Sequence, residues 1–251
     1  MYTANAIRYI IRQTALLGCM ICCLFVLPSD SDAAKWESIP QELLTLQSNP
    51  YEPGAGALIV FNDAELRLFF KDKVWLEIET YRRIKVFNEE GKRYATVTIP
   101  HFSDDKISNI KARVILPNGD KIDMRAEAVV NVDRVSGVGR YSVAYSKIKK
   151  FTIPGVEDGA IIEYQFTRTS ENIYFLSAWT FQGEDYTLSS TFTATVPKEV
   201  QYTGAFSNLT QQPESTVEKW VDGRGTTYSW KVENLPGIKE EPYGPPDYAM
   251  L

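Results

Sequence analysis

The chain has few residues that could carry nucleophilic or metal-assisted catalysis. It contains three cysteines and one histidine, His101, among 251 residues. Triad-type serine catalysis needs a histidine base, and the G-x-S-x-G sequence of many serine hydrolases does not occur. A zinc site needs several nitrogen, sulfur or carboxylate ligands, whereas this chain offers one imidazole. We therefore expect a protein that is not an enzyme, and predict no catalytic, cofactor-binding or metal-binding residue.

The first residues have the pattern of an export signal. Arg8 and Arg12 precede the uncharged, mostly apolar run 14–27, and Ala33 and Ala34 supply small residues at a cleavage site. The run has 14 residues, whereas a helix that crosses a bilayer needs about 20. The pattern predicts a signal peptide over 1–34 and a periplasmic or secreted protein with no stable membrane span after cleavage. A retained membrane anchor is the alternative.

All three cysteines, Cys19, Cys22 and Cys23, lie inside this segment. The sequence 16–19, LLGC, resembles a lipobox, so a lipoprotein is a second alternative. If the signal peptide is removed, the mature chain has no thiol and no disulfide. A domain of this length can instead be stabilised by burial of apolar surface.

The charge balance argues against nucleic acid as a partner. The net charge is −5, and it stays −5 after cleavage because 1–34 contains two basic and two acidic residues. The one basic run beyond this segment is 147–150 (KIKK), which is too short for a phosphate-binding surface.

The mature chain is dominated by a period of two residues. Along 74–87 the even positions are mostly apolar, and the odd positions carry most of the charge. This alternation predicts a strand with one buried and one polar face. Similar alternation recurs at 109–116, 162–167, 191–196 and 227–232, and Asn118-Gly119 is typical of a hairpin turn.

No segment after residue 75 keeps a helical period for three turns. Amphipathic strands without intervening helices favour two antiparallel sheets packed face to face, so we predict an all-β sandwich. We place the sandwich at 58–237, after a lead-in at 35–57 and before a proline-rich connector at 238–251. A short helix is expected over Pro40 to Gln47, capped by Ser38 and Gln41; residues 63–73 fit either a helical turn or a strand.

Acidic residues are the first candidates for chemistry or binding. Glu77 and Glu79 share a strand face and could form a carboxylate pair, but Arg83 and Lys85 share that face, which favours a solvated, charge-mixed surface. Asp104-Asp105 and Glu157-Asp158 lack the spacing of a calcium loop.

Aromatic residues are plentiful, and some could form a platform for sugar rings. The candidates are Trp75, Tyr81, Trp179, Trp220 and Trp230. Core packing and cross-strand pairing are the alternative explanation for most of them.

Three segments together resemble a known family. They are Arg83 to Gly91 (RIKVFNEEG), Ala112 to Gly119 (ARVILPNG) and Phe151 to Phe166 (FTIPGVEDGAIIEYQF). Their order and spacing resemble the domain of unknown function found N-terminal to bacterial transglutaminase-like domains, over about residues 50 to 240. The glycines and prolines of these motifs specify turns, so the resemblance assigns no functional residue.

The resemblance implies a role beside another module. Members of that family usually continue past a proline-rich connector into a papain-like fold with a Cys-His-Asp triad, whereas this chain ends in the connector at Leu251. We therefore expect an exported, non-catalytic accessory or binding domain that docks on or positions a transglutaminase-like or protease-like module, in cis or in trans. The alternative is a module that binds a carbohydrate or envelope polymer through exposed aromatics.

Overall fold

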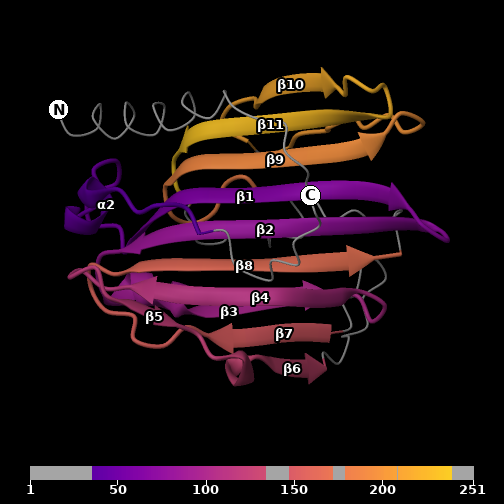
Figure 1. Cartoon of the computed structure of the whole chain (residues 1–251). Coiled ribbons are helices and arrows are strands. Elements are labelled where there is room, and N and C mark those ends of the chain that lie inside the picture. Colours follow the sequence, from indigo (N-terminus) through magenta and orange to yellow (C-terminus); the bar gives the residue numbers. More distant parts are fainter. Residues whose placement is uncertain (1–35, 134–146, 172–178, 208, 239–251) are drawn as a thin grey trace, which may run out of the picture.

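The computed structural model describes residues 36–133, 147–171, 179–207 and 209–238, and this part of the chain forms two β-sheets (Figure 1). The large sheet has eight strands in the order β10-β11-β9-β1-β2-β8-β4-β5, and the small sheet has three in the order β3-β7-β6. The prediction of an all-β protein with two packed sheets is confirmed.

Each of the five segments with predicted alternation falls on a strand of the large sheet, and six further strands complete the two sheets. The large sheet contains β1 (Ala57–Phe70), β2 (Val74–Val86), β4 (Lys106–Ile115), β5 (Lys121–Asp123), β8 (Ile161–Ser170), β9 (Thr187–Pro197), β10 (Glu214–Lys219) and β11 (Gly225–Leu235). The small sheet contains β3 (Thr96–His101), β6 (Val130–Asp133) and β7 (Lys147–Thr152). Residues 63–73, for which the sequence allowed either a helical turn or a strand, belong to β1 and to its turn into β2.

The large sheet is mixed, because β1 and β9 run parallel while its other neighbouring strands are antiparallel. A parallel pair needs a long crossover connection. Here the whole chain between β1 and β9, including the small sheet, makes that connection instead of one helix. The expectation of purely antiparallel sheets is wrong at this pair.

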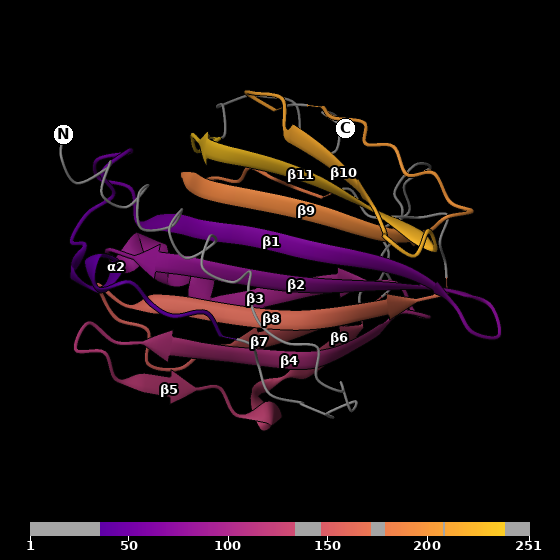
Figure 2. The ribbon, with the colours of Figure 1, turned by 45° about the horizontal axis from the view of Figure 1, so that its top comes forward.

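The inner face of the large sheet, which carries Ile84, Ile162 and Phe192, holds most of the core. One core cluster lies between β2, β4 and β8 of this sheet and β3 and β7 of the small sheet, where Ile84, Ile162 and Phe151 are almost fully buried. Figure 2 shows β3, β7 and β6 behind β2, β8 and β4. A second cluster, around Phe192 and Trp230, is covered by residues from irregular segments, such as Phe181 and Phe206.

The outer face, which carries Tyr81, Glu163 and Arg113, is covered at one end by the lead-in. This segment contains α2 (Gln41–Thr45), and its Leu43 packs with Leu58 and Ile161 of the sheet. The predicted helix is present, but its N-cap is Pro40 and no side chain caps it. The expected Ser38 cap is wrong, because Ser38 lies two residues before the N-cap; its backbone carbonyl accepts a hydrogen bond from Arg83 Nη1.

After β2 the chain forms the 3-10 helix η1 (Glu89–Ala95), and β3 then pairs with β7 in the small sheet. The Asn118-Gly119 turn between β4 and β5 is as predicted, with Gly119 at a φ of +90°. A second 3-10 helix, η2 (Ala126–Ala128), precedes β6.

Within the described ranges, no helix is both long and apolar enough to cross a membrane. The predicted signal peptide with its three cysteines and nearly all of the proline-rich connector lie outside the described residues.

Candidate binding face on the large sheet

Beyond the lead-in, the outer face of the large sheet presents three successive polar rows that run across the strands. The first row joins Lys111, Gln165, Tyr81, Asp63, Thr191 and Lys231. The second joins Thr167, Glu79, Glu65, Thr193 and Ser229, and the third joins Thr169, Glu77, Arg67, Thr195 and Thr227. Because side chains alternate along a strand, all of these groups project from one face.

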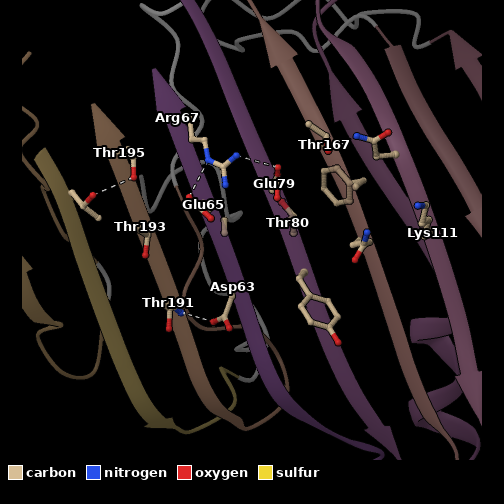
Figure 3. A pocket seen from close by; sticks show the side chains of 16 residues that line it. Asp63, Glu65, Arg67, Glu79, Thr80, Lys111, Thr167, Thr191, Thr193 and Thr195 are labelled. Carbon is tan, nitrogen blue, oxygen red and sulfur yellow. Dashed lines mark hydrogen bonds and ion pairs between the residues drawn. The ribbon is translucent and has the colours of Figure 1, made fainter. Parts of the chain in front are cut away.

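These rows form the floor of a groove of about 760 Å³, which we call the outer-face groove (Figure 3). Its lining is mostly polar and comes from β1, β2, β4, β8, β9 and β11. The lining residues are Asp63, Ala64, Glu65, Arg67, Glu79, Thr80, Tyr81, Asn109, Lys111, Gln165, Phe166, Thr167, Thr191, Thr193, Thr195 and Thr227. Binding sites are usually concave and contain polar groups that fix the orientation of the ligand, so this groove is a candidate.

Arg67 organises the acidic centre of the groove. Its Nε lies 3.0 Å from Glu65 Oε1, and its Nη1 lies 3.7 Å from Glu79 Oε1. Glu65 and Glu79 are direct cross-strand partners, an arrangement of like charges that destabilises a sheet. The guanidinium therefore offsets a repulsion within the floor.

Asp63 lies where the groove meets the covered end of the sheet. Its Oδ1 accepts a hydrogen bond of 2.9 Å from the Thr191 backbone N–H. Burial raises the pKa of Asp63 from 3.8 to about 6, although the bond to Thr191 opposes this change. Asp63 can therefore change its charge in mildly acidic solution.

A buried ionic cluster supports the groove beneath the lead-in. Glu163 is fully buried and accepts hydrogen bonds of 2.6 Å from Arg83 Nε and from Arg113 Nε. The Tyr81 hydroxyl donates to the same carboxylate at 2.8 Å. Burial, together with the charge of Glu163, raises the pKa of the Tyr81 hydroxyl well above its usual range.

The cluster also holds the lead-in against the sheet. Arg83 Nη2 donates to the Glu37 carbonyl at 2.9 Å, and Arg113 lies over the Trp36 ring at 4.6 Å. Lys85 is fully buried as well, and its ammonium donates to the carbonyls of Leu44, at 3.0 Å, and Gly159, at 2.5 Å. Burial lowers the pKa of Lys85 from 10.5 to about 8.

The structure corrects the interpretation of the strand face that carries Glu77 and Glu79. Both carboxylates lie on the outer face as expected, and Glu77 pairs across strands with Arg67. Arg83 and Lys85, however, are 3% and 0% exposed, so their part of this face is not solvated. Residues 36–46, distant in sequence, cover them, and no local pattern announces such a cover.

The candidate aromatics are divided between core and surface. Trp230 is buried in the core, Trp179 packs against the same cluster, and Tyr81 belongs to the ionic cluster. Trp220 is 41% exposed and Trp75 is partly exposed. Only these two of the five remain as surface platforms.

His101 is buried, with 4% of its surface exposed. Its Nδ1 lies 2.8 Å from the Phe102 carbonyl oxygen, and it lines a smaller pocket of about 370 Å³ with Lys147 and Lys149. Asp105 of the Asp104-Asp105 pair is buried and accepts a hydrogen bond from the Phe102 N–H. Among the described residues, no group of three or more His, Cys, Asp or Glu side chains could hold a metal ion.

Sequence reasoning missed the groove and most of its lining. The alternation of Thr191, Thr193 and Thr195 with apolar residues was visible and marks a polar strand face. The concavity and the contribution of six strands to one surface were not visible, because they depend on strand order.

The fold and the groove define a class, a two-sheet β-protein with a concave polar face. A family model described as a domain of unknown function with a solved structure, DUF3857, matches residues 76–239. The chain belongs to this family. No curated protein matches the chain.

One of the solved structures that match the chain has a similar fold. A protein of Parabacteroides distasonis described as a "putative protease" is 14% identical, with a TM-score of 0.62; the match covers 76% of this chain and 38% of that one. An M1 zinc metallopeptidase of Deinococcus radiodurans is 11% identical, with a TM-score of 0.35 and coverages of 70% and 39%. A "putative nutrient binding protein" of Legionella pneumophila is 12% identical, with a TM-score of 0.33 and coverages of 74% and 64%. The match thus spans about two fifths of the first two proteins.

Proposed function

We propose that the protein is an exported, non-catalytic accessory domain that positions a transglutaminase-like or protease-like module, in cis or in trans. The N-terminal signal pattern supports a periplasmic or secreted location. The resemblance of its motifs to domains that precede transglutaminase-like modules supports the choice of partner. The Parabacteroides distasonis protein, of which the match covers 38%, supports a place within a larger protease-like protein.

The proposal rests above all on residues 236–238, where hydrogen bonds hold the chain as it leaves the large sheet. After β11, the Pro236 carbonyl accepts a hydrogen bond of 2.7 Å from Gln182 Nε2. The Ile238 N–H donates to the Gly183 carbonyl at 2.8 Å. The backbone direction at residue 238 is thereby set by the domain, so the chain leaves the sheet from a defined position.

Glu52 connects this exit to the lead-in. Its Oε1 accepts from the Gly237 N–H at 3.3 Å, and its Oε2 accepts from the Tyr186 N–H at 3.2 Å. Gly237 is required for the close approach, because a Cβ there would lie 2.3 Å from the Glu184 carbonyl oxygen.

The test compares two variants in the chain joined after Leu251 to a transglutaminase-like or protease-like module of the organism that encodes it. Gly237→Ala displaces the exit, whereas Val217→Ala changes a side chain that is 62% exposed on the edge strand β10. We expect Gly237→Ala to lower turnover of the joined module and Val217→Ala to leave it unchanged.

The same module is also assayed alone and mixed with the separate domain. Binding of the separate domain, measured by calorimetry, together with altered turnover would support action in trans. Equal turnover for the module alone, mixed, joined and joined with Gly237→Ala, without any binding, would overturn the proposal.

A further inference from the structure

The outer-face groove continues toward the β1–β2 and β10–β11 turns into a row of aromatic side chains. One step beyond Arg67 and Thr195 along the strands, Phe69 pairs with Trp75, and Pro197 pairs with Gly225. Phe69 is 38% exposed. The two turns lie at the same end of the sheet, at the right of Figure 1.

Trp220 adds a ring that lies against the sheet at this end. A Cβ on Gly225 would be 2.9 Å from Cε3 and 3.0 Å from Cδ2 of Trp220, so the ring occupies the space that glycine leaves. Its indole N–H donates to Thr227 Oγ1 at 3.1 Å, and Thr227 lines the groove. With 41% of its surface exposed, Trp220 presents apolar ring surface directly beside the polar floor.

The four central strands of the floor offer side chains but no free edge for strand pairing. Strands β9, β1, β2 and β8 each have a hydrogen-bonded neighbour on both sides. An extended peptide that lies across these four strands could therefore not add a strand, which is the usual source of its affinity for a sheet. A ligand there must be recognised by hydroxyl, amide and carboxylate groups.

The polar groups are spaced regularly. Along β9, Thr191, Thr193 and Thr195 repeat at intervals of about 6.8 Å, and Ser229 and Thr227 lie opposite the last two. The Thr193 and Ser229 hydroxyls lie 3.2 Å apart, within hydrogen-bond distance. From the Asp63 row to the Gly225 row the face extends about 20 Å, the length of a short polymer segment.

We propose that the outer-face groove and the Trp220 ring together bind a segment of a neutral linear glycan. Threonine hydroxyls, the Asn109 and Gln165 amides and the floor carboxylates hydrogen-bond sugar hydroxyls, and a sugar ring stacks on Trp220. The lining contains three carboxylates and only two cationic side chains, Arg67 and Lys111. This excess of negative charge disfavours an anionic polymer. This binding role goes beyond the positioning of a module.

The test measures binding of the full exported chain to four probes by calorimetry. The neutral probes are cellohexaose and chitohexaose, the anionic probe is hexagalacturonate, and a lysine-rich peptide represents the other class of polymer. We expect at least one neutral probe to bind, hexagalacturonate to bind at least about tenfold more weakly, and the peptide not to compete.

Two variants then locate the site. Trp220→Ala is expected to weaken glycan binding about tenfold or more, and Thr193→Val, which keeps its shape, about threefold. Thr216→Val is the matched control, because Thr216 belongs to the same cross-strand row as Ser229 but lies on the exposed edge strand β10 outside the groove. We expect the control to bind normally.

The result is separable from the positioning of a module. Trp220 precedes β11, whereas the chain leaves the domain after the far end of that strand, so Trp220→Ala should not alter turnover of a joined module. The proposal is overturned if no neutral glycan binds, if only hexagalacturonate or the peptide binds, or if Trp220→Ala and Thr193→Val bind as tightly as the unaltered chain.

Discussion

Glu163→Gln is the substitution that most directly tests the buried ionic cluster. Glu163 is fully buried between Arg83 and Arg113, which are 3% and 7% exposed, and both guanidinium groups donate to it at 2.6 Å. Glutamine keeps the shape but removes the charge, so two buried cations lose their counterion. Breaking a buried ion pair in this way costs about 3–5 kcal/mol.

We expect Glu163→Gln to destabilise the lead-in locally as well. Arg83 also donates to the Glu37 and Ser38 carbonyls, so a displaced Arg83 would release the start of the lead-in. Urea unfolding of the exported chain measures the loss as a lower midpoint. Limited proteolysis would show earlier cleavage near residue 38 at urea concentrations where the sheet is still folded.

Glu79→Gln is the matched control for this prediction. Its side chain is 52% exposed on the same sheet face, and its ion pair with Arg67 has a distance of 3.7 Å. Removal of an exposed ion pair changes stability by about 0–1 kcal/mol. If Glu163→Gln costs no more than Glu79→Gln, the cluster does not stabilise the fold as we have argued.

Three further changes have predictable outcomes. The folded-state pKa of Lys85 is lowered to about 8, so above that pH the folded state binds fewer protons than the unfolded state. The free energy of unfolding should therefore rise by up to about 3 kcal/mol between pH 8 and 10.5. Urea midpoints should show this rise, and Lys85→Met should abolish it. The raised pKa of the Tyr81 hydroxyl lowers the free energy of unfolding with rising pH, but only above about pH 10. Because the pKa of Asp63 is raised to about 6, its burial destabilises the protein as pH rises from 3.8 through 6. Asp63→Asn should therefore stabilise the protein at pH 7.5 by up to about 3 kcal/mol, and an unchanged thermal midpoint would contradict this. Gly225→Ala should displace the Trp220 ring, which a methyl group would meet at 2.9 Å, and a shift in tryptophan fluorescence would report it.

Much of the fold could be predicted because local patterns determine the individual strands. The alternation along 74–87 predicted both the strand β2 and its buried face, with Ile84 and Val86 in the core. Asn118-Gly119 predicted a turn that depends on positive φ at one glycine. These features depend only on near neighbours in the sequence.

The candidate site was less predictable because it depends on long-range pairing. Lys85 looked like a solvated residue, since nothing near it in the sequence indicates that α2 folds over it. The groove requires that β9 lie beside β1, and Thr191 then donates to Asp63, 128 residues earlier in the chain. The period of two predicts a polar face for each strand but not which polar faces adjoin.

The parallel pairing of β1 with β9 has a consequence for how the chain reaches its folded state. β1 can form a hairpin with β2 early, but its other edge stays open until residues 187–197 are available. Pairing across such a separation is slow, because the closure entropy of the whole intervening chain must be overcome first. Meanwhile β1 exposes an unpaired edge that includes Leu58, Val60 and Leu66, which is a site for aggregation. A protein built in this way would benefit from a holding chaperone between synthesis and the completion of its sheet.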